Sequence, residues 1–490
     1  MSLSSSPLDA NAFPRESIHA APEDFARSYC DFIAASPTAY HAAACIASIL
    51  RDAGFTLRDE GDSWTARERK GFVVRDGAVI AWKTPARKER DAGVRIVGSH
   101  TDSPSFHLKP VVDTEMYGYG QVNVEVYGGP LLNSWLNRDL GLAGRLVTLD
   151  GDEKLVRTGA VMTIPQVAPH LDRSANVELK LSAQRDYHPI WSTTGGNTTS
   201  GSAVTHLADA AGVAAEQIAA MDIFAYDTQP PQVFGAGEKC FIAAGRQDNL
   251  SSVYAALSAF VQAGQCQQED RGGQSAENWQ EENLQDEKPH SATQRGLDTQ
   301  CQPAAQRQRT DECQDIQIFA AFNNEEIGSR TYSGAAGAFL ESVLRRLIER
   351  EYGMGSEVFE RVMAHSSCLS ADAGHAVNPN RPDLHDPAHQ VQLGGGPMVK
   401  VHASGAYSSN AVTQALLARA ARKAGVRLQA FVSHNDVPCG TTIGPLTATR
   451  LGIPTVDCGI PLLSMHSVRE LSSPRDVRDL ARLIYAYLEA

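Results

Sequence analysis

The sequence predicts an α/β fold in which a mixed-sheet domain is interrupted by a separate β-rich domain. Helical periodicity alternates with short apolar runs of strand length near both ends of the chain. Between about residues 103 and 237 the sequence pattern changes to alternating Val, Tyr and Gly with residues typical of tight turns. The α/β pattern then resumes. We therefore expect one domain from residues 1–102 and 238–490, and a second, β-rich domain from 103–237.

Composition limits the class of protein before any motif is considered. The 490 residues are 42% hydrophobic and 21% charged, and no apolar run is long enough to span a bilayer. A formal net charge of −13 argues against nucleic acid or an anionic membrane as a partner. The N-terminus lacks a secretory pattern, and the nine cysteines lack metal-finger or CxxC spacing, so we expect a cytoplasmic protein with reduced thiols.

The N-terminal stretch predicts a helical pair and then three strands. The helical pattern covers residues 22–54 and breaks at Ser36-Pro37-Thr38. Strand-like runs follow at 71–74, 78–82 and 94–99. The last run ends in His100-Thr101-Asp102, where the histidine can bind a metal ion and the aspartate can support it from behind. A single HxD pattern is more often coincidental than functional.

The β-rich segment contains a hairpin signal. Residues 145–149 and 154–157 read as strands that flank the turn Asp150-Gly151-Asp152. The Gly-rich stretch Thr193–Ser202 lacks the lysine of a phosphate-binding loop, so nucleotide binding is not supported.

The α/β pattern resumes with a strand at 239–245 and a helix at 250–261, with Asp248 between them. Asp248 taken alone is more typical of a helix N-cap than of a metal ligand. From 264 to 315 the chain consists largely of Gln, Glu, Asp, Arg and Gly, and we expect a disordered insertion there because so few apolar residues cannot form a core.

The apolar run Ile316–Phe322 predicts a buried strand that delivers Glu325 and Glu326 to its carboxyl end, where ligands gather in α/β sheets. Two neighbouring carboxylates repel each other unless a cation lies beside them. A solvated acidic loop would be the more common interpretation of this stretch in isolation.

The C-terminal part repeats the arrangement of strand followed by polar loop. A helix at 338–350 precedes a strand at 367–370 that ends near Asp372. A helix at 411–424 precedes strands at 427–432 and 455–459, with His466 beyond the last.

Together these segments present two imidazoles and several carboxylates, so coincidence becomes the weaker explanation. They are His100, Asp248, Glu325, Glu326, Asp372 and His466. Such a set suits two divalent ions, and its ligand chemistry favours zinc, with manganese or cobalt also compatible. If Asp248, Glu326 and Asp372 bind the ions, Glu325 is left as a general base. No HExxH motif is present, which excludes the single-zinc helix architecture.

At this point the chain resembles the aspartyl aminopeptidase family of di-zinc exopeptidases over nearly its whole length. The motifs that carry the resemblance are His100–Pro104, Gln247–Asn249, Asn323–Ser329, Asp372 to Pro379, Asp436–Gly440 and Met465–Ser467. The resemblance implies metal ligation by His100, Asp248 (bridging), Glu326, Asp372 and His466. It implies catalytic roles for Glu325, Asp102 and His170, and substrate contacts from His170, Glu325, His375, Lys400 and Tyr407.

The resemblance also implies an activity and an assembly. We expect hydrolysis of the N-terminal residue, preferably Asp or Glu, from peptides with a free N-terminus. The β-rich domain is expected to form subunit contacts and to cap the site in a homo-oligomer built from dimers, up to a dodecamer. His170 is expected to reach the site of a neighbouring subunit. The Gln-rich insertion departs from the compact connection that the family pattern leads us to expect.

Two alternatives remain open. Related exopeptidases share the five-ligand pattern, so a di-zinc deacylase or carboxypeptidase is the enzymatic alternative. A non-catalytic assembly or cargo scaffold is the other. It is disfavoured because every ligand position and Glu325 are intact.

Overall fold

The computed structural model describes residues 17–64, 68–86, 92–193, 201–236, 240–264 and 314–490. Most of the predicted insertion, residues 265–313, lies outside the described residues. The described residues at its two edges form hydrogen bonds with the fold. The Gly264 N–H donates to Glu489 at 3.0 Å, and the Asp315 carboxylate accepts hydrogen bonds from Gly93 and Arg95 at 2.8 Å each.

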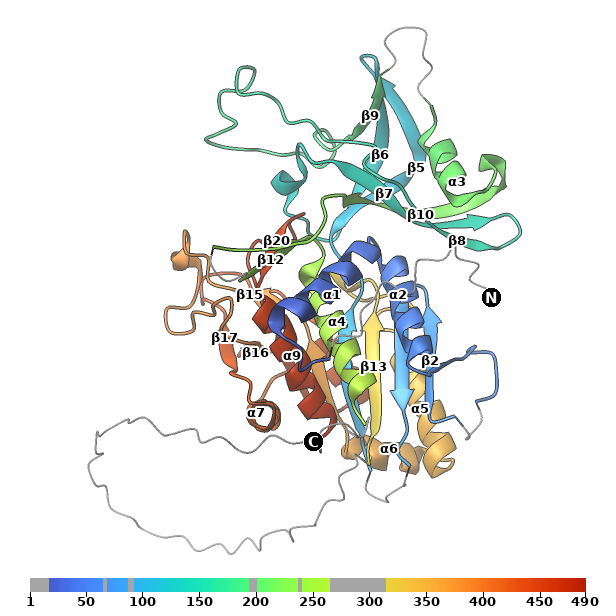
Figure 1. Ribbon diagram of the computed structural model, residues 1–490, viewed down its shortest axis with the longest axis vertical. Coiled ribbons are helices and arrows are strands. Elements are labelled where there is room, and N and C mark those ends of the chain that lie inside the picture. The colour runs from blue at the N-terminus through green and yellow to red at the C-terminus, as the bar shows by residue number, and fades with distance from the viewer. Residues whose placement is uncertain (1–16, 65–67, 87–91, 194–200, 237–239, 265–313) are drawn as a thin grey trace, which may run out of the picture.

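A mixed sheet of nine strands forms the centre of the larger part of the molecule (Figure 1). In spatial order the strands are β1 (Thr56–Leu57), β2 (Lys70–Arg75), β3 (Ala78–Lys83), β13 (Ile316–Phe322), β4 (Val94–His100), β14 (Ser367–Ala371), β18 (Thr455–Gly459), β16 (Met398–Val401) and β17 (Gln429–Val432). The four central strands β13, β4, β14 and β18 are parallel, so their carboxyl ends meet at one edge. The mixed α/β fold predicted from the sequence is confirmed.

Strand β13 is continuously apolar because both faces of the sheet are covered. Ile318 and Phe322 point to one hydrophobic core, and Phe319 and Ala321 point to the other. The sole polar side chain in the strand, Gln317, donates from Nε2 to the Leu488 carbonyl at 3.0 Å, while its buried Oε1 has no donor among the described residues. The predicted buried strand is therefore present at its predicted bounds.

Helices cover the two faces of this sheet as separate layers (Figure 1). One layer contains α1 (Pro22–Ala35), α2 (Ala39–Asp52), α4 (Gln247–Gln262), α7 (Ala411–Ala424) and α9 (Pro474–Leu488). The other contains α5 (Phe339–Tyr352), α6 (Ser356–Ala364) and α8 (Ile443–Leu451). Helices α6, α8 and α9 were not predicted from the sequence.

A second sheet, entirely antiparallel, stands beyond the ends of the helices (Figure 1). Its six strands are β8 (Glu153–Arg157), β7 (Leu140–Thr148), β10 (Ile218–Asp227), β5 (Ser105–Met116), β6 (Tyr119–Tyr127) and β9 (Ile190–Thr193), and α3 (Ala203–Ala211) packs on it through Leu207. The β7–β8 hairpin is the predicted one, with Gly151 at φ +84° in its turn. The whole sheet lies inside residues 103–237, although the division into two domains stays a prediction.

Two small sheets complete the described secondary structure. Strands β11 (Gln232–Phe234), β12 (Phe241–Ala244) and β20 (Glu470–Ser472) form one, and β15 (Gly374–His375) and β19 (Pro461–Leu462) form the other. Within the described ranges, no helix has the length and apolar character needed to cross a membrane.

Candidate metal centre

The predicted ligands gather at the carboxyl edge of the nine-stranded sheet. His100 ends β4, Asp372 follows β14, and Glu325 and Glu326 form the short 3-10 helix η4 (Glu325–Ile327) after β13. Asp248 lies in the first turn of α4, after β12. His466 lies beyond β18, where the sequence placed it, but with the short strand β19 between them. It lies in the turn between β19 and β20, which brings it back to the same edge.

The first half of the site is organised around His100. Its Nε2 atom lies 3.4 Å from Asp248 Oδ1 and 3.4 Å from Asp372 Oδ1. Its Nδ1 atom lies 3.0 Å from the Asp102 carbonyl oxygen, so Nδ1 carries the proton and donates. The free Nε2 lone pair therefore faces the two carboxylates, as metal ligation requires.

The second half of the site is organised around His466. Its Nε2 atom lies 3.4 Å from Asp248 Oδ2 and 3.5 Å from Glu326 Oε2, while its Nδ1 donates to the Gly129 carbonyl at 2.9 Å. Asp248 thus presents one carboxylate oxygen to each histidine. This is the arrangement expected of a bridging ligand.

The unsatisfied oxygens of this cluster indicate what it would hold. Asp248 Oδ1 and Glu326 Oε1 are buried and lack a hydrogen-bond donor among the described residues. Buried carboxylate oxygens without a partner are costly, and a cation removes that cost. Three groups of side chains have ligand atoms within 4.8 Å of one another, and their mixed nitrogen and oxygen donors suit zinc and similar divalent ions. The residues present therefore fit divalent metal ions of this kind.

The pKa values of the cluster show the same shortage of positive charge. Burial alone would raise the pKa of Asp248, but the imidazoles of His100 and His466 beside its carboxylate hold it below its ordinary range. Burial alone would lower the pKa of His466, yet the hydrogen bond to Asp248 and the charge of Glu326 raise it to about 10. The cluster therefore favours positive charge between its carboxylates.

Glu325 differs from its neighbour Glu326. Its nearest approach to a site imidazole is 4.0 Å, between its Oε2 and His100 Nε2. Burial, together with the charges of Asp372 and Asp102 and against that of His100, raises the pKa of Glu325 to about 7.

Asp102 positions both glutamates from behind. Its Oδ1 accepts the Glu325 N–H at 3.0 Å, and its Oδ2 accepts the Glu326 N–H at 3.1 Å. Oδ2 also accepts the Tyr127 hydroxyl, from strand β6, at 2.9 Å. The carboxylate is 4% exposed, so these contacts are shielded from water.

Glu470 has the corresponding position behind Asp248 and His466, and sequence reasoning missed it. Its Oε2 accepts the backbone N–H groups of Gln247 at 2.6 Å and Asp248 at 3.2 Å, and its Oε1 accepts that of His466 at 2.8 Å. Glu470 is only 1% exposed to solvent. The available signal was an acidic residue four positions after His466, at the first position of the short strand β20.

The predicted substrate residues have different environments. His375 and Tyr407 line a pocket of about 280 Å³ together with Phe431 and His434. Lys400 does not line it. Its Nζ donates to Asp372 Oδ2 at 3.1 Å and to the Ala373 carbonyl, and the side chain is 2% exposed. Lys400 therefore neutralises and orients a predicted metal ligand.

His170 is exposed on the long connection between β8 and β9, which extends away from the body of the chain (Figure 1). In the part of the chain that the structure describes, no hydrogen bond or ion pair joins His170 to the other predicted site residues. A single chain does not bring it to the metal centre through such contacts.

The chain is similar to known peptidases along most of its length. The sequence model of the family described as "Aminopeptidase I zinc metalloprotease (M18)" matches residues 32–300 and 296–487. A protein from Streptomyces coelicolor, "Probable M18 family aminopeptidase 2", is 39% identical over 475 residues, which are 96% of this chain and 99% of that protein.

Solved structures agree with the sequence comparison. The crystal structure of prApe1 superposes with a TM-score of 0.81 at 27% identity, covering 95% of this chain and 94% of that one. The S. cerevisiae mApe1 dodecamer gives a TM-score of 0.74 at 26% identity, with 95% and 96% of the two chains covered.

Proposed function

This chain belongs to the M18 family of zinc metalloprotease aminopeptidases, and from that premise we propose how its own residues divide the work of removing an N-terminal residue. We propose that His100 and Asp372 hold one divalent ion and that Glu326 and His466 hold another. Asp248 bridges the two. The observation that carries this proposal is the pair of 3.4 Å approaches from the two Asp248 oxygens to the two imidazoles. Zinc fits this donor set best, and manganese or cobalt is compatible with it.

The bound ions would supply Lewis acidity, which polarises the scissile carbonyl and makes water a stronger nucleophile at neutral pH. Glu325 is the proposed general base. Its carboxylate takes a proton from the attacking water and passes that proton to the leaving amine. Asp102 fixes the positions of Glu325 and Glu326 because its carboxylate accepts hydrogen bonds from their two backbone N–H groups. Asp102 is a positioning residue, since its carboxylate is occupied by these bonds.

We propose an acidic preference for the residue that is removed. The pocket lined by His375, Tyr407 and His434 presents imidazole and hydroxyl groups that can donate to a carboxylate. Backbone N–H of Asp436 donates to His434 Nδ1 at 3.1 Å, which leaves the Nε2–H of a neutral His434 ring as a donor. Lys400 Nζ lies 5.4 Å from the centre of the Tyr407 ring, so it adds positive charge near the pocket while it remains paired with Asp372.

We propose that the working unit is at least a dimer within a homo-oligomer. His170 would donate a hydrogen bond to the oxyanion that forms in a neighbouring subunit's site. Support comes from its exposed position and from the dodecameric assembly of the S. cerevisiae relative. A dimer-based assembly of this chain follows from that proposal.

A hydrolysis panel tests the proposed function. Asp-, Glu-, Leu- and Arg-amides and N-acyl amino acids are given to zinc-loaded protein. We expect the highest kcat/KM on Asp- or Glu-amides and no turnover of N-acyl substrates. Preferential turnover of N-acyl substrates would instead identify a deacylase.

A further inference from the structure

A short connector at the exit of the six-stranded sheet lies directly against the metal centre. It comprises residues 127–131, which join the end of β6 to the 3-10 helix η2 (Leu132–Trp135). Its residues contact Asp102, Glu326 and His466, although it follows a strand of the other sheet. The metal centre therefore has one wall that the nine-stranded sheet does not supply.

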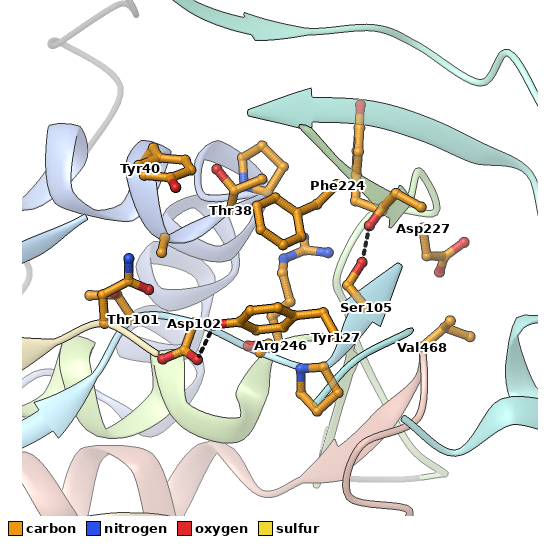
Figure 2. A pocket seen from close by; sticks show the side chains of 18 of the residues that line it. Thr38, Tyr40, Thr101, Asp102, Ser105, Tyr127, Phe224, Asp227, Arg246 and Val468 are labelled. Carbon is orange, nitrogen blue, oxygen red and sulfur yellow. Dashed lines mark hydrogen bonds between the residues drawn. The ribbon is translucent and has the colours of Figure 1, made fainter. Parts of the chain in front are cut away.

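Tyr127 supports the carboxylate that positions the two glutamates. Its hydroxyl donates to Asp102 Oδ2 at 2.9 Å, as Figure 2 shows, and accepts the Asn324 side-chain amide at 2.9 Å. Its ring packs edge-on against Phe224, with 5.2 Å between the ring centres. These contacts fix the hydroxyl between Asp102 and the residue that precedes Glu325.

Gly128 allows the backbone to pass close to Glu326. Its φ is +69°, a conformation that residues with a side chain rarely adopt. A Cβ atom at this position would lie 3.0 Å from Glu326 Cβ and 3.5 Å from Glu326 Oε2. Non-bonded carbon atoms prefer a separation of about 3.5–4.0 Å, so a side chain here would displace Glu326, a predicted metal ligand.

Gly129 and Leu131 hold His466. The Gly129 carbonyl accepts the His466 Nδ1–H at 2.9 Å, and the Leu131 N–H donates to the His466 carbonyl at 2.8 Å. His466 lies in a turn with φ +65°, and its side chain is 31% exposed. The direction in which its Nε2 atom points therefore depends on a carbonyl of the connector.

The other half of the site is held within the nine-stranded sheet. His100 donates from Nδ1 to the carbonyl of Asp102, two residues along the chain, and its side chain is 2% exposed. Asp372 pairs with Lys400 of strand β16 at 3.1 Å. Among the described residues, no hydrogen bond or ion pair joins His100 or Asp372 to the connector.

We propose that the connector is a positioning element for only one half of the metal centre, the half formed by Glu326 and His466. Gly128 and Gly129 set the affinity of those two side chains for a divalent ion, whereas His100 and Asp372 bind theirs without help from the connector. Because His466 is also the more exposed imidazole, the ion at Glu326 and His466 is the more readily exchanged of the two. This inference rests on the two-ion centre proposed above.

Zinc buffers test this inference on the full-length protein. Zinc-loaded protein is equilibrated with a series of chelator buffers that lower the free zinc concentration, and bound zinc is measured by elemental analysis. We expect zinc to leave in two steps, of which the step at higher free zinc belongs to Glu326 and His466. His466→Gln should lack that first step and keep the other, which assigns it.

Gly128→Ala is the decisive variant. It should move the first step to about 10- to 100-fold higher free zinc, as for other residues that orient metal ligands, and leave the second step unchanged. Gly151→Ala is the matched control. Gly151 also has a positive φ, +84°, but no atom of the described chain lies within 4 Å of an added Cβ, so both steps should match those of wild type.

Tyr127→Phe provides an independent test that keeps the packing. It removes the hydroxyl from Asp102 and leaves the ring against Phe224, so the first step should shift by about tenfold in the same direction. If Gly128→Ala fails to fold, an unchanged first step in Tyr127→Phe overturns the inference by itself.

The zinc steps also separate this inference from the proposed function. Two steps in wild type that Gly128→Ala leaves in place, or moves by equal factors, would refute the role of the connector while the two-ion centre stands. A wild type that binds a single ion would instead refute the two-ion centre, and the inference with it.

Discussion

The metal centre and the outer part of the six-stranded sheet each contain groups without a partner, but the groups differ in kind. At the carboxyl edge of the nine-stranded sheet, carboxylates such as Asp248 and Glu326 are buried with unpaired oxygens. In the segment that contains the six-stranded sheet, Tyr117, Leu171 and Val177 are 94%, 85% and 89% exposed. Buried anions call for cations, whereas exposed apolar groups call for another protein surface. The kind of partner that each region needs can therefore be inferred from what it leaves unsatisfied.

The largest expected effect concerns the two adjacent glutamates at the metal centre. Glu325→Gln should lower kcat by about 100-fold or more, because a general base is lost, while metal content stays at wild-type level. Glu326→Gln is the matched control and should lose metal, since it removes a predicted ligand. Elemental analysis and steady-state kinetics measure the two effects. Equal metal loss in both variants would contradict the division of roles.

The next effect tests whether the unpaired carboxylates are held in place from behind. Asp102→Asn keeps the size of the side chain but weakens acceptance of the Glu325 and Glu326 N–H groups. Zinc affinity should fall by about 10- to 100-fold, as for other residues that orient metal ligands. Competition with a fluorescent chelator measures this. Asp113→Asn, which removes a carboxylate that caps α3, should leave zinc affinity unchanged.

The junction between the two regions is expected to be sensitive to acid. Burial, together with the charges of Arg157 and Arg246, lowers the pKa of His41 in α2 to about 3. The unfolded chain has a histidine pKa of about 6.5, so it binds a proton first as the pH falls. His41 therefore contributes stability above pH 6.5 that is lost between pH 6.5 and 3.

Replacement by glutamine isolates this effect. Between pH 6.5 and 5 the free energy of unfolding of wild type should fall by about 1–2 kcal/mol more than that of His41→Gln. Urea denaturation at each pH measures the difference. Parallel pH profiles for the two proteins would show that His41 is protonated in the folded state.

The smallest expected effect is the activity restored by mixing two inactive variants, and it tests His170 in the exposed region. Co-expression of His170→Ala with Glu325→Ala should restore about a quarter of wild-type activity if the site is shared between two subunits. Half of randomly paired dimers are mixed, and each mixed dimer holds one intact site. Activity no higher than that of either variant, in assemblies proven to be mixed, would show that each chain works alone.

The sequence was informative where function follows directly from position along a strand. His100, Glu325, Glu326 and Asp372 each follow an apolar run, and parallel strands bring such positions together. Phe322 and His100 are in fact paired across β13 and β4. Hydrophobic periodicity and motif position were therefore sufficient for this edge of the sheet.

Other parts depend on long-range contacts that leave no local pattern. Glu470 functions through backbone N–H groups more than 220 positions away in the chain, at Gln247 and Asp248. Helix α9 was missed, although its apolar face is buried against α4 and α7. Lys400 was expected to read a substrate side chain, yet its contacts are with Asp372 and Ala373, and its role in specificity stays a prediction.

The Tyr127–Asp102 hydrogen bond has a consequence for how the chain acquires activity. Tyr127 belongs to β6 in the six-stranded sheet, while Asp102 and the glutamates it supports follow strands β4 and β13 of the nine-stranded sheet. His466 likewise donates to Gly129, 337 positions away along the chain. Contacts at such separations form only after both sheets have folded and docked. A nascent or partly folded chain should therefore have no peptidase activity. In refolding experiments, zinc uptake should occur later than the recovery of the helical circular dichroism signal. The topology of the chain itself would thereby protect the cell from the activity of unassembled peptidase.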